Sequence, residues 1–159
     1  MIYIGVNNCY WLTTYNVTNL GGNKFINGLI FGMADMCSSI FSGVLMSYVS
    51  PFTAFRICAL ISVVFNALNQ FAVPFGTFTS YLTLFVAILG VGSVYTCIFV
   101  LVGLVLPSDQ KSGAMIIIVT IGASLSIGAP MIIVLDSPYP FFFLSSFMAI
   151  SIASSLMLK

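Results

Sequence analysis

Charged residues are what this sequence lacks most. Its 159 residues include only four basic and three acidic side chains, or 4% of the chain. A water-soluble domain carries about a quarter charged residues. Hydrophobic residues instead make up 60% of the chain, and the mean hydropathy is +1.18. This composition excludes a water-facing surface and predicts an integral, multi-pass membrane protein. The net charge of +1 also excludes the basic footprint of a nucleic-acid-binding protein.

Histidine is absent, which excludes a Ser-His-Asp triad and histidine-ligated metal or haem. The sequence has no GxxxxGK[ST] phosphate-binding loop. Its three aspartates lie in separate segments, so a paired-carboxylate site is not expected. We therefore predict that the chain is not an enzyme and uses no cofactor or metal. Four widely spaced cysteines are interpreted as small buried hydrophobes rather than disulfide partners or metal ligands; they are Cys9, Cys37, Cys58 and Cys97.

Long apolar runs, separated by short polar breaks, dominate the sequence. A helix needs about 20 mostly apolar residues to cross a bilayer. The runs lack the alternation of period two that is typical of membrane barrel strands. We therefore predict an all-α membrane protein, residues 1–159 forming one bundle of six antiparallel transmembrane helices. The predicted spans are 2–18, 25–49, 52–73, 79–106, 113–135 and 139–158.

The few charges predict an orientation in the membrane. Six spans place both ends of the chain on one side, together with Arg56, Lys111 and Lys159, whereas Lys24 and Asp136 lie opposite. Basic residues favour the cytoplasmic side, or its matrix or stromal equivalent. We expect Arg56 and Lys111 to lie in loops that fix the topology and contribute to gating.

Polar residues inside the apolar runs are candidates for function. The first span carries Asn7, Asn8 and Asn16, and each amide in lipid needs a partner or a cavity. Asp35 lies near the middle of the second span, in "GMADMCSSIFSG". A carboxylate inside the membrane is a functional-site hypothesis by default. The alternative is an aspartate that holds two helices together through a hydrogen bond.

Small residues and a weak internal repeat indicate close helix packing. Residues 6–16 and 90–97 are both interrupted by polar or glycine residues, and each begins a group of three spans. Two opposed groups of three helices are typical of transporters. Pairs of small residues four apart are expected to let helices approach closely. These pairs are Gly28/Gly32, Ser39/Gly43, Gly122/Ser126 and Ser124/Gly128.

Two stretches carry a resemblance to a known family. The stretch "CYWLTTYNVTNLGGNKFINGLIFGMADM" (9–36) resembles helices seven and eight of the major facilitator superfamily, in the organic cation/anion transporter branch. Tyr10 and Trp11 match an aromatic pair, and Gly32 and Asp35 match a Gly-x-x-acid motif. Residues 95–130 resemble helices ten and eleven, with a Pro, basic residue and Gly turn at Pro107, Lys111 and Gly113.

The resemblance implies that the chain is the C-terminal half, helices seven to twelve, of a twelve-helix fold. Such a half needs an N-terminal six-helix half, in the same or a separate chain. The family's charged residues are largely replaced. Only Arg56 remains near the Gly-Arg-basic loop after helix eight, and Leu104, Ala123 and Ser39 stand where the family has Glu, Arg or Lys.

Two functions follow. The first is transport of a small organic solute, uncharged or weakly cationic, by a divergent major-facilitator-type transporter. Its aromatic residues would offer cation–π contacts, or would only pack and anchor the helices. The second is a degenerate, transport-inactive scaffold subunit of a larger membrane assembly. The predicted substrate-lining residues are Asn7, Tyr10, Trp11, Asp35, Tyr95 and Ser124.

Overall fold

Helices make up almost the whole described structure. The computed structural model describes residues 2–17, 23–72, 76–126, 146 and 148–153, and 95% of them are helical. The predicted all-α class is confirmed. The elements are α1 (Ile2–Val17), α2 (Lys24–Tyr48), α3 (Pro51–Ala72), α4 (Thr77–Val105), the 3-10 turn η2 (Ser108–Gln110) and α5 (Lys111–Ser126).

Three helices, α2, α3 and α4, are long and apolar enough to cross a membrane. Their limits agree with the predicted spans 25–49, 52–73 and 79–106 to within two residues. The first predicted span corresponds to α1, and α5 begins two residues before the predicted 113 because η2 leads directly into it. The remainder of the fifth span and most of the sixth lie outside the described residues. Three membrane-spanning candidates are therefore found in the described part of the chain, against six predicted.

The turn between α2 and α3 is as short as the predicted spans require. Pro51 is the first residue of α3, a position at which proline's missing N–H needs no partner. The Ser50 hydroxyl lies 2.8 Å from that of Thr53 and helps to begin the helix. The turn thus consists of Val49 and Ser50 alone. Arg56 lies in the second turn of α3, within the predicted span 52–73, and its role in topology and gating stays a prediction.

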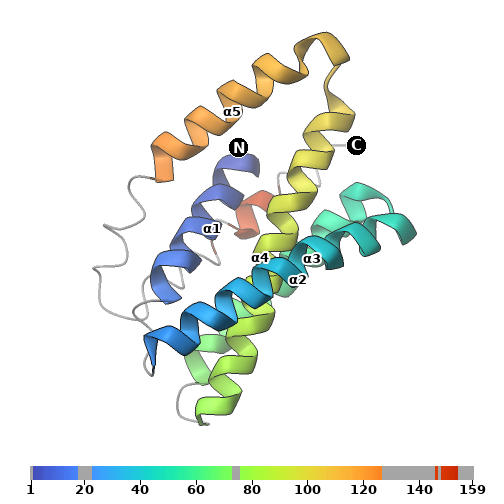
Figure 1. The fold of residues 1–159 in the computed structure, drawn as a ribbon. Coiled ribbons are helices and arrows are strands. Elements are labelled where there is room, and N and C mark those ends of the chain that lie inside the picture. Colours follow the sequence, from blue (N-terminus) through green and yellow to red (C-terminus); the bar gives the residue numbers. More distant parts are fainter. Residues whose placement is uncertain (1, 18–22, 73–75, 127–145, 147, 154–159) are drawn as a thin grey trace.

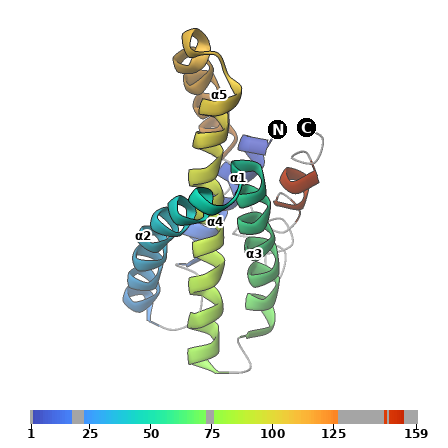
Figure 2. The same ribbon diagram turned by 90° about the vertical axis from the view of Figure 1, so that its right-hand side faces the viewer.

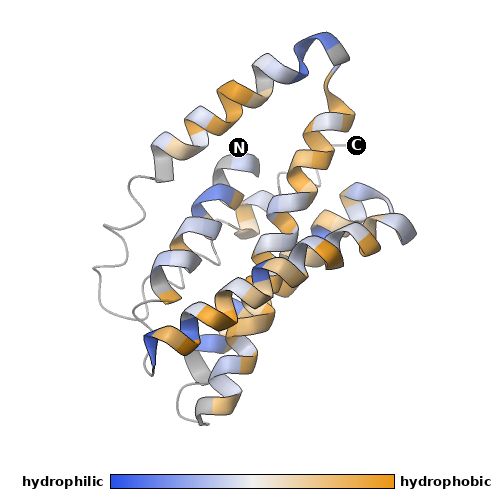
Figure 3. Ribbon diagram, viewed as in Figure 1, coloured by the Kyte–Doolittle hydropathy of each residue, from blue (hydrophilic) through white to orange (hydrophobic). Residues whose placement is uncertain are grey.

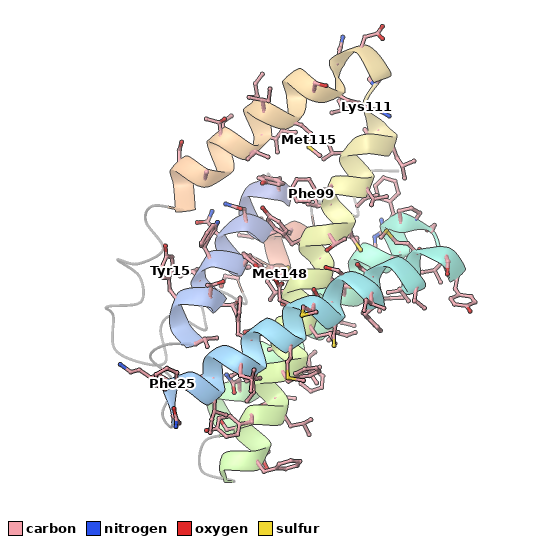
Figure 4. All side chains as sticks on the ribbon, viewed as in Figure 1. Tyr15, Phe25, Phe99, Lys111, Met115 and Met148 are labelled. Atoms are coloured by element: carbon pink, nitrogen blue, oxygen red, sulfur yellow. The ribbon has the colours of Figure 1, made fainter. Side chains whose placement is uncertain are left out.

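The long helix α4 is the centre of the arrangement (Figure 1). Helix α3 runs beside it along most of its length, and α2 crosses it obliquely (Figure 2). Helix α1 contacts α4 and pairs with α5. Figure 4 labels Met148, which is fully buried in the hydrophobic core formed with α1, α3 and α4. Among the four cysteines three are buried as predicted, but Cys37 is exposed because it lies on the outward face of α2.

Helix α2 has the opposite distribution of polar and apolar residues to a helix on the surface of a water-soluble protein. Its buried residues are all small or polar, whereas its large apolar side chains face outward. Phe25 is 89% exposed and Met36 is 74% exposed. Strongly hydrophilic residues occur mainly at helix ends, as at the beginning of α2 and of α5 (Figure 3). An apolar exterior of this kind is typical of a helix surrounded by lipid. The buried residues of α2 are Asn27, Ala34, Ser38 and Ser42.

Glycines allow the closest contacts, but not where the sequence predicted them on α2. Gly28, Gly32 and Gly43 have no atom of another described residue within reach of an added side chain. No described residue packs against them, and their predicted packing role stays a prediction. The close contact is made by Gly90 of α4 instead. A methyl group there would lie 2.8 Å from the backbone nitrogen of Ser62 in α3, which is too short for a carbon contact.

We predict that Gly90→Ala destabilises the protein by about 1–3 kcal/mol, because the added methyl group overpacks against backbone that cannot rotate away. Gly103→Ala in the same helix is the matched control, since its side chain would meet no described atom. It should be neutral or slightly stabilising, as alanine favours helix. Thermal unfolding followed by circular dichroism in detergent measures both variants. Equal stability of the two would contradict the close α3–α4 contact.

Candidate functional site

An acidic and aromatic cluster lies where α1, α2 and α4 meet. The hydroxyl of Tyr10 in α1 donates a hydrogen bond to Asp35 Oδ2 in α2, at 3.3 Å. The Tyr10 ring stacks on Tyr95 of α4, with the ring centroids 5.0 Å apart and the planes inclined by 26°. The ring of Phe31 contacts Tyr10 edge-on at 6.3 Å. The structure thus brings together three of the predicted site residues from three helices.

The side of Asp35 away from Tyr10 is held against the backbone of α4. A side chain at Gly92 would lie 3.0 Å from Asp35 Oδ1 and would overlap the Ser38 hydroxyl, so only glycine permits this contact. Ser93 donates a hydrogen bond from its hydroxyl to the Ser38 carbonyl oxygen, at 3.1 Å. The Ser38 hydroxyl in turn donates to the Asp35 carbonyl oxygen, at 2.6 Å. Asp35 is therefore positioned both by α1 and by the α2–α4 contact.

Further aromatic rings extend the cluster along α1 and α4. Phe99 meets Tyr95 edge-on with centroids 5.1 Å apart. Tyr3 lies 6.3 Å from Tyr95 and 6.0 Å from Phe99. Figure 4 shows Phe99 at the height of the first turns of α1. Tyr3 and Tyr10 are two turns apart on one helix face, so this face of α1 presents a continuous aromatic surface to α4.

Asn7 lies between these two tyrosines and faces α5. Its side chain is 2% exposed. Among the described residues, no group accepts a hydrogen bond from its Nδ2 atom. Gly122 of α5 lies opposite. A methyl group there would lie 3.4 Å from Asn7 Nδ2 and 2.5 Å from Cε1 of Tyr3. Gly122 is thus the glycine that lets α5 approach α1.

Trp11 lies at the edge of this cluster, where its ring meets that of Tyr10 edge-on with the centroids 6.1 Å apart, whereas Ser124 lies apart from it. Trp11 is 37% exposed and stacks on Tyr15, with centroids 5.9 Å apart. Ser124 is exposed, and its hydroxyl donates to the carbonyl oxygen of Thr120 in its own helix. Their assignment as substrate-lining residues stays a prediction. Lys111 is the first residue of α5 and follows the turn, close to where it was expected.

Sequence reasoning missed Tyr3, Ser38, Gly92 and Ser93. A signal for Ser38 is present in the sequence. The small and polar residues of α2 recur at intervals of three or four, or a multiple of these, through an otherwise apolar helix. In a membrane helix such a stripe marks the protein-facing side, because lipid cannot satisfy polar groups. The sequence contains no comparable signal for Gly92, whose importance comes from a contact with another helix.

No known protein family and no curated protein sequence matches the chain. The resemblance to the major facilitator superfamily therefore stays a prediction. The geometry alone defines the site as an intramembrane-type carboxylate, hydrogen-bonded to a tyrosine and flanked by stacked rings.

We predict that Tyr10→Phe lowers the free energy of unfolding by about 1 kcal/mol, the usual contribution of one hydrogen bond. The ring contacts with Tyr95 are kept, so the loss reports the bond to Asp35 alone. Tyr48→Phe is the matched control, because Tyr48 is 83% exposed at the end of α2. The free energy of unfolding of each variant is measured in detergent. An equal loss in both variants would show that the Tyr10–Asp35 hydrogen bond does not stabilise the protein.

Proposed function

We propose that the chain is an integral membrane protein of six helices that forms the C-terminal half of a divergent major-facilitator-type transporter. It would move a small organic solute across the bilayer together with an N-terminal six-helix half. The three apolar helices of spanning length support a membrane location. Helix count, family and transport go beyond that support and are parts of the proposal.

One observation carries the proposal, namely that equivalent tyrosines of α1 and α4 stack on each other. The segments Val6 to Tyr10 and Val91 to Tyr95 share a valine four residues before the tyrosine. These two helices begin the two predicted groups of three, and they run in opposite directions (Figure 1). In an inverted repeat, equivalent residues of the central helices meet near the pseudo-two-fold axis. The Tyr10–Tyr95 stack fits that position.

The contacts beside the stack follow the same relation. Three residues before Tyr95, Gly92 meets α2; three residues before Tyr10, Asn7 meets Gly122 of α5. Helices α2 and α5 are the second members of the two groups. Each central helix therefore pairs with the second helix of the other group, which supports two interlocked repeats of three helices.

The cluster is suited to recognising a solute that is uncharged or weakly cationic. Asp35 accepts hydrogen bonds and would attract positive charge, while the faces of Tyr10 and Tyr95 offer cation–π contact. Transporters of this kind hold their solute near the middle of the membrane, between the repeats. The proposed path runs along α1, where Tyr3, Asn7 and Tyr10 lie.

A scaffold subunit without transport is the second candidate. It is favoured by the hydrogen bond that already occupies Asp35 and by the open glycine face of α2. A protein partner with small residues could pack closely on that face. In this case Asp35 would serve only to join α1 and α2.

The proposed topology places positions 22 and 110 on opposite sides of the membrane. We predict that Gly22→Cys and Gln110→Cys are labelled by a membrane-impermeant maleimide from opposite faces of sealed vesicles. Cys37→Ser removes the exposed native thiol in both. Labelling of both positions from one face would exclude the alternating arrangement.

Asp35 separates the two functions. In a transporter, Asp35→Asn should lower solute uptake at least tenfold or remove its pH dependence while complex yield is kept, because only the ionisable group is lost. In a scaffold, Asp35→Asn should leave the yield of the assembled complex unchanged. There, Asp35→Leu should reduce the yield of the assembled complex, because the Tyr10 hydroxyl loses its acceptor.

Uptake into vesicles and yield of the purified complex are measured for both variants. Tyr48→Phe, at the exposed end of α2, is the matched control for assembly. Full uptake and full yield in both Asp35 variants would remove Asp35 from either function.

A further inference from the structure

The contact between α1 and α5 contains an unpaired hydrogen-bond donor. Asn7 Nδ2 is the buried side-chain atom that finds no acceptor in the described part of the chain. Asn66 of α3 is a comparable buried asparagine, but its side-chain amide donates a hydrogen bond to the Ser62 carbonyl oxygen at 2.8 Å. Buried amides are nearly always paired, and an unpaired one in an apolar environment is strongly unfavourable. An unpaired donor kept in such a place points to an acceptor that arrives with a ligand.

The surroundings of Asn7 are aromatic and shaped by a glycine. Tyr3 lies one turn away on α1, and its ring is in contact with Phe99. Gly122 faces both Tyr3 and Asn7, where any larger residue would meet them. The amide therefore lies beside a flat aromatic surface rather than among other polar groups.

Helix α5 is the less tightly packed wall of this seam among the described helices. It packs mainly against α1 and only slightly against α4, whereas α2, α3 and α4 are packed closely on one another. Most of its residues are exposed, including Ile116 at 67% and Ile117 at 60%. Figure 4 shows Met115 on the side of α5 that faces α4. Displacing α5 would open the seam at Asn7 and leave the central three helices intact.

The charge distribution indicates a neutral ligand. The described charged residues other than Asp35 lie within or next to the first two turns of their helices. Asp35 itself is engaged by Tyr10 on the side of α2. An anionic ligand at Asn7 would therefore find no cation among the described residues to neutralise it, and burial of an unpaired charge is strongly unfavourable. The described charged residues are Lys24, Asp35, Arg56, Asp109 and Lys111.

We propose that the α1–α5 seam at Asn7 binds a neutral, flat organic molecule through a carbonyl oxygen. The oxygen accepts the hydrogen bond of Asn7 Nδ2, and the ring of the molecule lies against Tyr3. This inference rests on the proposed function, because the molecule is the class of solute that the transporter would carry.

Acetophenone and α-methylstyrene test it, because they have nearly the same shape and only the ketone has an acceptor oxygen. The full chain is purified in detergent with any partner that accompanies it. We expect acetophenone to bind at least tenfold more tightly than α-methylstyrene, measured by the rise in unfolding temperature with ligand concentration. The infrared band of carbonyl-labelled acetophenone should move to lower wavenumber on binding.

Two variants should remove this preference. Asn7→Leu keeps the size of the side chain and lacks the donor, so both probes should then bind equally and the infrared shift should disappear. Gly122→Ala should weaken binding of both probes, because its methyl group fills the approach to Asn7. Gly103→Ala is the control and should change neither.

Stability supplies an independent readout. Asn7→Leu should be at least as stable as the wild type, whereas Asn66→Leu should be less stable because it loses a paired amide. Loss of folding in Asn7→Leu would mean that Asn7 has an acceptor within the chain and would overturn the proposal. Equal binding of the two probes by the wild type, or an unchanged preference in Asn7→Leu, would do the same. Failure of ketone uptake with the binding preference intact would refute transport alone.

Discussion

The structure depends above all on satisfying polar groups within the protein, because an apolar exterior offers them no partner. Most hydroxyls solve this locally by donating to a carbonyl three or four residues earlier, as Thr13 does to Cys9 and Thr96 to Gly92. The groups that cannot do so define where helices meet. The Asp35 carboxylate accepts a hydrogen bond from the Tyr10 hydroxyl, and the side-chain oxygen of Asn69 accepts one from the Thr83 hydroxyl at 3.1 Å. Interhelical polar contacts therefore mark the protein-facing side of each helix, and the large apolar residues are left to face outward.

Close packing follows from that constraint. Small polar residues on the inner faces bring helix backbones together only if the opposite helix also carries a small residue. Helix α4 supplies Gly90 towards α3 and Gly92 towards α2, which explains why it can be central to both. Gly122 does the same between α5 and α1. At Gly90 and Gly92 the glycine meets a serine of the neighbouring helix, so that backbone approach occurs beside a small polar residue, whereas Gly122 meets Tyr3 most closely.

The sequence was sufficient for the all-α class and for the limits of the long helices, since apolar run length and polar breaks are local properties. It also indicated Asp35, Tyr10 and Tyr95, because polar and aromatic residues are conspicuous in apolar runs. For the glycine pairs of α2 it predicted close packing, but no described residue lies against them. Spacing shows that residues share a helix face, but only the neighbouring helix decides whether that face is covered. The same reason hid Gly92 and Ser93.

Helix α1 connects the two seams of the site. Asn7 and Tyr10 are three residues apart, so their directions around the helix differ by only about 60°. Any rotation or shift of α1 that exposes Asn7 to a ligand at the α5 seam must also move the Tyr10 hydroxyl relative to Asp35. That hydrogen bond is already long at 3.3 Å, so a small movement weakens it. A movement of α1 would therefore couple occupancy of the seam proposed at Asn7 to the state of the carboxylate, through the rigid body of a single helix.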